Sequence, residues 1–227
     1  MDTTIKKQIV NFLWIEGELT KVSFASLSSF QKLGYKCVLY HYGKVTNIPK
    51  GIIVKDGSTV LDLIQGNPAL FSDYFRYKLL LRDGGIWSDC DNILQKRLPK
   101  AKYIFSGNKN VVHSHIIKTP KGAPILKDII NIIEGLEDKI GRGLFIGDNL
   151  GRKVVEHKLE EYLIHADYLN PLETIDRNYY LGSKIIDWKT EFKDAYNIHL
   201  HYSNHRVVLR ENENYKINIK KLLEDYE

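Results

Sequence analysis

The chain has 227 residues, of which 43% are hydrophobic and 27% are charged, and its formal net charge is +5. These proportions are typical of a globular protein with enough residues for a full sheet-and-helix core, and we expect one domain. They exclude a low-complexity chain, and no apolar run is long enough to cross a bilayer.

Cysteine content and charge distribution narrow the function classes further. The sequence has two cysteines, Cys37 and Cys90, which provide no disulfide framework and no paired metal spacing. The first eight residues lack a secretory-signal pattern, so we expect a cytoplasmic protein. Its basic residues are spread along the chain. This argues weakly for an anionic partner and against a nucleic-acid-binding module, which would gather them on one element.

The N-terminal segment has the order strand, helix, strand. Residues 8–15, which are mostly apolar, predict a buried parallel strand, and Thr20 can cap a helix that runs to residue 32. Strands are predicted at 36–42 and 52–54, and a helical turn at 59–64. Because ligands collect at the carboxyl ends of parallel strands, Trp14 lies at the expected ligand edge.

Residues 71–98 contain the strongest chemical signal. Aromatic and apolar residues recur at helical spacing over 68–82, Pro68 suits the first turn, and Gly84-Gly85 ends the helix. A short strand at 86–88 then leads into Asp89 and Asp91.

Two acids separated by one residue point to the same side of an extended chain, so Asp89 and Asp91 can converge on one cation. Hard carboxylate ligands suit Mn²⁺ or Mg²⁺. On the preceding helix, Asp73 and Arg76 share a face and could contact hydroxyl and phosphate oxygens, although such a pair is commonly a surface salt bridge. Cys90 faces the other way and is expected to pack in the core.

The second half of the chain predicts alternating strands and helices. Strands are expected at 103–106, 111–118, 162–166 and 185–188, and an amphipathic helix at 124–136. His113 and His115 share a strand face, where half-exposed packing is favoured over a ligand role. The glycine-rich segment 141–151 matches neither a P-loop nor a dinucleotide fingerprint. A final helix in 213–227 is expected to dock on the core or to touch an anionic membrane as a peripheral contact.

The order S-D-x-x-R followed by G-G-x-x-x-D-x-D over residues 72–91 resembles the signature of GT-A glycosyltransferases that carry the DXD sugar-nucleotide site. Within that group the sequence is similar to capsular-polysaccharide and lipooligosaccharide-type sugar transferases, to yeast mannosyltransferases and to the glucosylating domain of clostridial toxins. The resemblance implies an α/β fold with a mixed, Rossmann-like sheet flanked by helices. It also implies a nucleotide-binding half at about 1–98, an acceptor-side half at about 99–210 and a tail at 211–227.

The resemblance also implies roles for particular residues. Trp14, in the turn W-I-E-G, would stack on the nucleotide base, or else belongs to the core. Asp148 and Asn149 correspond to a turn near the transferred sugar, where Asp148 could equally cap a helix. A late histidine, serine or asparagine closes the metal site in many such enzymes. In the stretch H-L-H-Y-S-N-H-R, our preferred donors are His201 and Asn204, with His199 and Ser203 as alternatives.

These observations together predict a hexosyltransferase-type enzyme. It would transfer a sugar from a nucleoside diphosphate sugar, UDP-linked, to a hydroxyl acceptor during glycan or polysaccharide synthesis, with retention of configuration expected. Inversion would need a carboxylate base, for which Asp148 is the candidate. A phosphohydrolase that uses the D-x-D acids and a basic nucleic-acid-binding module are the alternatives. The sequence leaves the donor sugar, the acceptor and the oligomeric state open.

Overall fold

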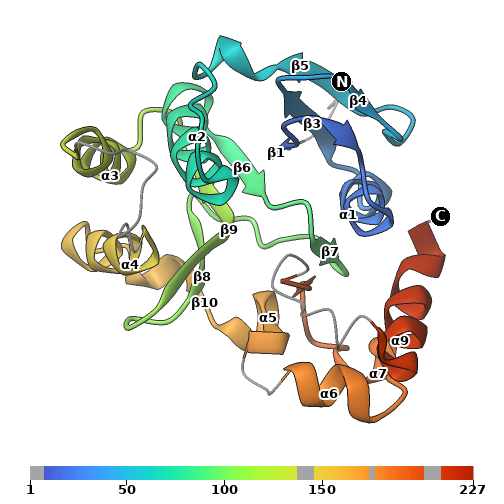
Figure 1. Ribbon diagram of the computed structural model, residues 1–227. Coiled ribbons are helices and arrows are strands. Elements are labelled where there is room, and N and C mark those ends of the chain that lie inside the picture. Colours follow the sequence, from blue (N-terminus) through green and yellow to red (C-terminus); the bar gives the residue numbers. More distant parts are fainter. Residues whose placement is uncertain (1–7, 137–145, 174–176, 202–210, 227) are drawn as a thin grey trace, which may run out of the picture.

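A seven-stranded sheet forms the centre of the computed structural model, which describes residues 8–136, 146–173, 177–201 and 211–226 (Figure 1). In spatial order its strands are β10 (Leu163–Ile164), β8 (Ile104–Gly107), β9 (Val112–Thr119), β6 (Gly85–Ser88), β1 (Ile9–Leu13), β3 (Lys36–His41) and β5 (Ile53–Asp56). Two smaller pairs join β7 (Asn92–Leu94) to β11 (Asn197–His199), and β2 (Gly17–Glu18) to β4 (Val45–Thr46).

The sheet is mixed. Strands β5, β3, β1 and β6 run parallel to one another, whereas β9 is antiparallel to both β6 and β8. The carboxyl ends of β1 and β6 therefore meet at one edge, because Asn11 pairs with Trp87 in the parallel register. Trp14 and Asp89 follow these two ends, so the structure supports the expected ligand edge.

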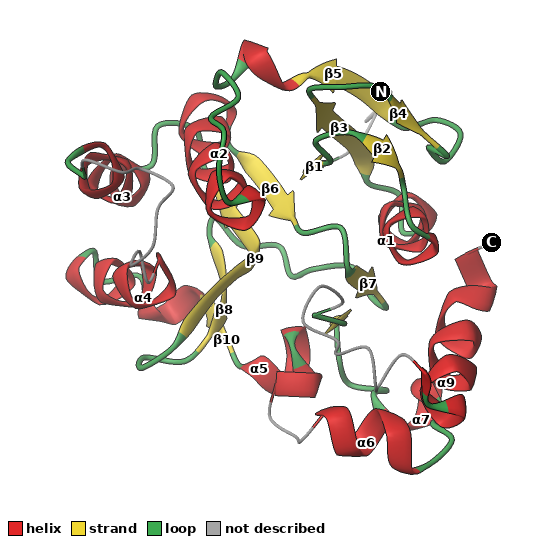
Figure 2. Ribbon diagram, in the orientation of Figure 1, coloured by secondary structure: helices red, strands yellow, loops and turns green. Residues whose placement is uncertain are grey.

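Helices flank the sheet on both sides (Figure 2). The described helices are α1 (Lys21–Lys32), α2 (Pro68–Asp83), α3 (Pro124–Glu134), α4 (Ile146–Glu156), α5 (Ala166–Leu169), α6 (Arg177–Ser183), α7 (Trp188–Glu191) and α9 (Glu213–Leu223). Contacts join α2 to α3, α3 to α4, and α4 to β9. Helix α1 contacts β3, β7 and α9. The expected fold class, a mixed sheet flanked by helices, is confirmed.

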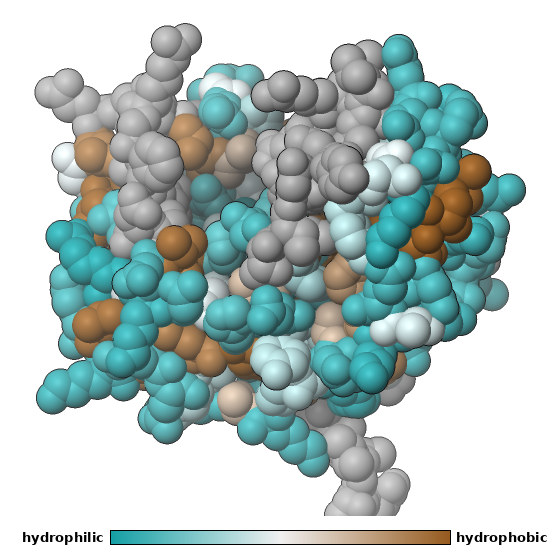
Figure 3. Space-filling model, turned by 90° about the horizontal axis from the view of Figure 1, so that it is seen from below, coloured by the Kyte–Doolittle hydropathy of each residue, from teal (hydrophilic) through white to brown (hydrophobic). Residues whose placement is uncertain are grey.

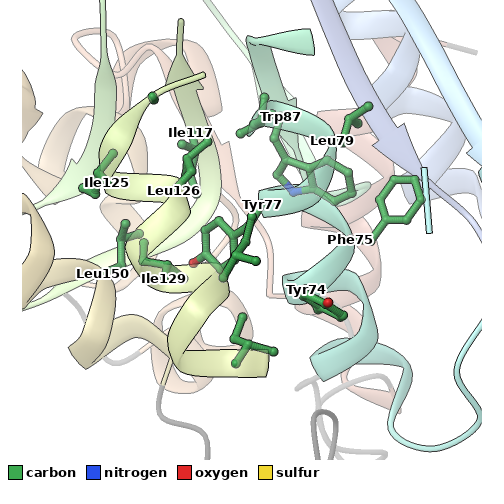
Figure 4. Packing of buried hydrophobic residues seen from close by; sticks show 14 of the residues in the cluster. Tyr74, Phe75, Tyr77, Leu79, Trp87, Ile117, Ile125, Leu126, Ile129 and Leu150 are labelled. Carbon is green, nitrogen blue, oxygen red and sulfur yellow. The ribbon is translucent and has the colours of Figure 1, made fainter. Parts of the chain in front are cut away.

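Two apolar layers hold α2 and α1 in place. On one face, Phe75 and Tyr77 of α2 are fully buried with Trp87 of β6 and with the apolar side of α3 (Figure 4). The other layer lies beneath α1, where the rings of Phe12 and Phe30 meet edge to face with centroids 5.3 Å apart. Burial of this much aromatic surface fixes the helix that carries Asp73 and Arg76.

Local signals fixed the boundaries of α1 and α2. Thr20 Oγ1 accepts a hydrogen bond from the backbone N–H of Ser23, which is the expected N-cap. Helix α2 begins at Pro68 behind an Asn67 cap and ends at Gly84, whose φ of +68° is a left-handed conformation that glycine adopts without strain.

A C-terminal layer packs against α1 and β7. In α9, apolar residues such as Leu222 and Leu223 are buried. This helix therefore docks on the core, which was one of the two alternatives expected for it. The predicted strand at 185–188 is wrong. Asp187 instead caps the short helix α7 by accepting from the backbone N–H of Thr190, and the Trp188 side chain is buried with its Nε1–H donated to the carbonyl of Asn218.

The surface of the molecule is largely hydrophilic on the face shown in Figure 3, where hydrophobic residues form separate patches. None of the helices that the structure describes is both long and apolar enough to cross a membrane.

Candidate metal centre

Asp89 and Asp91 lie in the turn between β6 and β7, at the ligand edge of the sheet. The backbone N–H of Asp89 donates to the carbonyl of His115 on β9 over 2.9 Å, and the carbonyl of Asp91 accepts from the N–H of Leu200 over 3.0 Å. The first acid is therefore tied to the central sheet and the second to the late segment of the chain. This places both carboxylates between two parts of the protein that are distant in sequence.

His199 joins the two acids. Its Nε2 lies 3.3 Å from Asp91 Oδ1, and one donor atom from each of Asp89, Asp91 and His199 falls within 4.8 Å of the other two. The antiparallel pairing of β11 with β7 sets this geometry, because it places His199 opposite Asn92, the residue that follows Asp91. Two carboxylates and one imidazole form a donor set that suits a divalent cation such as Mn²⁺.

Arg76 connects the helix to the acids. Its Nη2 lies 3.0 Å from Asp73 Oδ1 and 3.0 Å from Asp89 Oδ1. Nη1 donates to both the carbonyl and the hydroxyl of Ser114, and Nε donates to the carbonyl of Ser72. These partners match all the donor groups of a guanidinium. In this conformation Arg76 clamps the two carboxylates, and its expected contact with the donor sugar stays a prediction.

Asp73 is the outer carboxylate of this clamp. Its Oδ1 accepts from the hydroxyl of Ser114 over 3.3 Å as well as from Arg76. Asp89 Oδ1 accepts in turn from the indole Nε1–H of Trp87 over 2.9 Å, and the guanidinium carbon of Arg76 lies 5.0 Å from the centroid of that indole. Both acids are thus oriented by hydrogen bonds from neighbouring β-strands.

The site carries an excess of negative charge. Burial raises the pKa of Asp89 to about 6, and Asp91 adds to this effect while Arg76 opposes it. Burial also raises the pKa of Asp73. When ionised, the carboxylates of Asp73, Asp89 and Asp91 exceed the single guanidinium by two charges. A divalent cation would balance that excess, because a nearby positive charge favours the ionised form of a carboxylate.

Two other predicted residues are His201 and Trp14. The ring of His201 packs against that of His199, and its Nε2 lies 3.1 Å from Glu173 Oε2 and 3.0 Å from Asn170 Oδ1. Trp14 packs at the edge of the apolar layer beneath α1, and its buried Nε1 has no hydrogen-bond partner among the described residues. The roles predicted for both stay predictions.

The remaining candidates lie on or beyond α4. Asp148 and Asn149 fall in the first turn of that helix, where Asn149 Oδ1 accepts from Arg152 over 3.2 Å. The side chain of Asp148 and all of Asn204 lie outside the described residues. Cys90 donates from its thiol to the carbonyl of Leu13 over 3.3 Å and packs against the layer beneath α1, which fits its expected core position.

Sequence reasoning named His199 as an alternative donor and preferred His201. The pairing that selects His199 depends on β7 and β11, two strands of three residues each. Segments this short carry little periodicity, so neither was singled out at its observed bounds. The one local sign of this pairing in the sequence is the polar residue Asn92 directly after D-C-D. Asn92 pairs with His199 across the two strands.

Comparisons with known proteins bear on the same region. Residues 52–113 match the family described as "Glycosyltransferase sugar-binding region containing DXD motif". A comparison with curated protein sequences gives no significant match. Among solved structures, the chain is similar to the PaToxG glycosyltransferase, with 11% identity, a TM-score of 0.45 and coverage of 96% of this chain and 86% of that one.

The chain also resembles the apo form of the glycosyltransferase GlyE from Streptococcus pneumoniae, with 11% identity and a TM-score of 0.46. That alignment covers 97% of this chain and 63% of GlyE. The family match covers Asp73, Arg76 and both acids. The chain therefore contains a region that matches the DXD-containing sugar-binding region of glycosyltransferases.

Proposed function

We propose that this protein is a glycosyltransferase that transfers a sugar from a nucleoside diphosphate sugar, UDP-linked, to a hydroxyl acceptor in glycan or polysaccharide synthesis. The observation that carries the proposal is the convergence of Asp89, Asp91 and His199 within 4.8 Å, with both acids inside the residues that match the DXD sugar-binding family. These three side chains would hold Mn²⁺ or Mg²⁺. When bound, the cation supplies positive charge that stabilises the departing diphosphate.

The chain's own residues would prepare this site for the donor. Arg76 holds the carboxylates of Asp73 and Asp89 in fixed orientations, so neither has to be ordered when the donor binds. Asp73 would then accept hydrogen bonds from donor-sugar hydroxyls, and Trp14 would stack on the base at the end of β1. Asp148 and Asn149 remain the proposed residues on the acceptor side.

The stereochemical outcome is proposed as retention. A retaining transfer needs no strong protein base, whereas inversion would need a carboxylate close to the acceptor hydroxyl, with Asp148 as the candidate. Peripheral contact with a membrane through the lysines of α9 is a further part of the proposal, since Lys216, Lys220 and Lys221 lie outside its buried face. The cytoplasmic location expected from the sequence is proposed with it.

Metal titration and product analysis test the proposal. We expect wild-type protein to bind Mn²⁺ by calorimetry and, with UDP-sugars, to release UDP. Asp91→Asn and His199→Ala should each weaken Mn²⁺ binding by about tenfold or more while the fold is kept, since removal of a ligand costs more than the tenfold typical of its supporting contacts. Release of inorganic phosphate in place of UDP would indicate a phosphohydrolase.

The chain provides a matched control. His165 and Asp167 form a surface pair with Nδ1 and Oδ2 3.2 Å apart, close to the 3.3 Å of the His199–Asp91 pair. Asp167→Asn and His165→Ala remove the same chemical groups away from the proposed site, and both should leave Mn²⁺ affinity unchanged. Equal affinity in Asp91→Asn and Asp167→Asn would contradict the proposed site.

A further inference from the structure

The second ring nitrogen of His199 lacks the support that metal-binding histidines usually have. Such histidines almost always donate the other ring N–H to a carboxylate, a carbonyl or water, which fixes the ring orientation. In His199, Nε2 faces Asp91, and the buried Nδ1 has no hydrogen-bond partner in the part of the chain that the structure describes. Another interaction must therefore hold this ring in position.

Ring packing is that interaction. The imidazole of His115 lies nearly parallel to His199, with centroids 4.2 Å apart and an angle of 9° between the planes. The imidazole of His201 also packs against His199, with a centroid separation of 3.7 Å. His199 thus contacts two other imidazoles, and its orientation depends on where those rings are anchored.

His115 is anchored at both ring nitrogens. Its Nδ1 lies 2.9 Å from Asn92 Oδ1, and its Nε2 lies 3.0 Å from Ser106 Oγ. The Nδ2 amide of Asn92 donates to the carbonyls of Asp89 and His115, so Oδ1 is the acceptor and His115 Nδ1 carries the proton. The hydroxyl of Ser106 then donates to Nε2, which fixes a single tautomer.

The anchor of His115 is also rigid. Asn92 and Ser106 are fully buried, and His115 is 2% exposed. Burial lowers the pKa of His115 well below its usual range, and the nearby histidines act in the same direction. With Nδ1 donating to Asn92 and Nε2 accepting from Ser106, the ring that packs on His199 is neutral and adds no positive charge beside the two acids.

His201 supports the same ring from the end of β11. The Cα atoms of residues i and i+2 of an extended strand lie about 6.6 Å apart. A φ of +50° at His201 departs from the extended strand, and the centroids of the two rings lie closer together than that Cα spacing. Two acceptors, Asn170 Oδ1 and Glu173 Oε2, face His201 Nε2, so this nitrogen donates and fixes the second ring.

We propose that His115 is a positioning residue for the cation site: its anchored ring holds His199 Nε2 toward Asp91 by stacking, in place of the usual hydrogen bond. This inference rests on the proposed function, since it concerns the same three ligands. Its chemical consequence is that the cation affinity of the site depends on a side chain that contacts neither the cation nor the sugar nucleotide.

A double-mutant cycle with Mn²⁺ as the probe tests the inference on the full-length protein. Loss of a supporting contact typically costs 10-fold to 100-fold in metal affinity, and we expect a loss of about that size in His115→Ala. In the His199→Ala background, His115→Ala should cause no further loss, because the effect acts through His199. Additive losses, or an unchanged dissociation constant in His115→Ala, would overturn the inference.

Ser106→Ala is the second variant, in case His115→Ala does not fold. It removes one anchor and leaves the ring, and it should lower Mn²⁺ affinity in wild type but not in the His199→Ala background. His113→Ala is the matched control on the same strand. The His113 ring centroid lies 6.2 Å from that of His115, and we expect Mn²⁺ affinity to stay unchanged.

Electron spin-echo spectroscopy of bound Mn²⁺ separates the possible failures. A histidine nitrogen coupling is expected in wild type, weakened or shifted in His115→Ala and absent in His199→Ala. Mn²⁺ bound to wild type without this coupling would overturn the role of His115 and leave a cation held by the acids. No Mn²⁺ binding by wild type would overturn both this inference and the proposed function.

Discussion

Replacement of Arg76 by methionine is expected to destabilise the protein strongly. The side chain of Arg76 is 5% exposed and bridges Asp73 and Asp89, each at 3.0 Å. Removal of one partner of a buried ion pair costs about 3–5 kcal/mol, because the remaining charge is left unpaired. Asp89 is 29% exposed, which gives it partial access to water. We therefore expect the lower end of that range, about 3 kcal/mol.

Urea denaturation of Arg76→Met measures this loss, with Arg82→Met as the matched control from the same helix. Arg82 pairs with Asp83, but both side chains are more than 40% exposed. A surface pair of this kind contributes about 0–1 kcal/mol. If Arg76→Met lost no more stability than Arg82→Met, the buried clamp would not hold the acids together.

Urea denaturation in the presence of Mn²⁺ tests whether the proposed cation stabilises the folded protein. A ligand at 100 times its dissociation constant stabilises the folded protein by about 2.7 kcal/mol. Loss of the guanidinium leaves more negative charge around Asp89 and Asp91, so a given Mn²⁺ concentration should stabilise Arg76→Met more than wild type. Equal stabilisation of the two proteins would argue against a shared electrostatic site.

Three further predictions follow from other residues. Trp14→Ala should weaken nucleotide binding by about 1–3 kcal/mol, the usual value for a stacked base, and an unchanged dissociation constant by calorimetry would assign Trp14 to the core. Gly122→Ala should lower the free energy of unfolding in urea by about 1 kcal/mol, because Gly122 has a φ of +72° but a Cβ there meets no atom. Gly84→Ala, at a φ of +68°, should lower it by about 1–3 kcal/mol more, because its Cβ would collide with backbone atoms. The pKa of Glu173 is lowered to about 2, chiefly by the hydrogen bond from His201. Its stabilising effect is therefore complete above the unfolded pKa and lost as pH falls toward 2. Glu173 is 39% exposed, so Glu173→Gln should lose only about 1 kcal/mol at pH 7, and the difference from wild type should narrow between pH 5 and pH 2 in urea denaturation.

The elements that sequence predicted well are those with local signals. Helix α2 was bounded by Pro68 and Gly84, and the observed helix starts at that proline and ends before that glycine. The two acids were singled out from one short motif, and they lie together at the carboxyl edge of the parallel strands. Such features depend on neighbours within a few residues, which a single sequence displays directly.

The features that sequence could not supply depend on pairing between distant segments. Asp187 was assigned to a strand because its neighbours are apolar, but its side chain caps α7 and the following tryptophan is buried under α9. The short pairing of β7 with β11 is another case, because it joins residues 105 positions apart. Alternation placed His199 and His201 on one face of an extended strand, whereas His201 leaves the strand with a φ of +50°. Alternation also contained no information on which ring reaches the acids.

Asn92 shows how one residue links the motif to the distant segment. Its Nδ2 amide donates to the carbonyl of Asp89, and its Oδ1 accepts from the Nδ2 of Asn197 over 2.7 Å. Asn197 begins β11, and His199 lies two residues further, on the same side of the strand. The residue that directly follows the second acid therefore sets both the turn that presents the acids and the position of the strand that carries the third ligand. Because a misplaced Asn197 would leave buried amide groups unpaired, the register of β11 is strongly constrained. On this argument, the four residues 89–92 specify two proposed ligands and the docking site of the third.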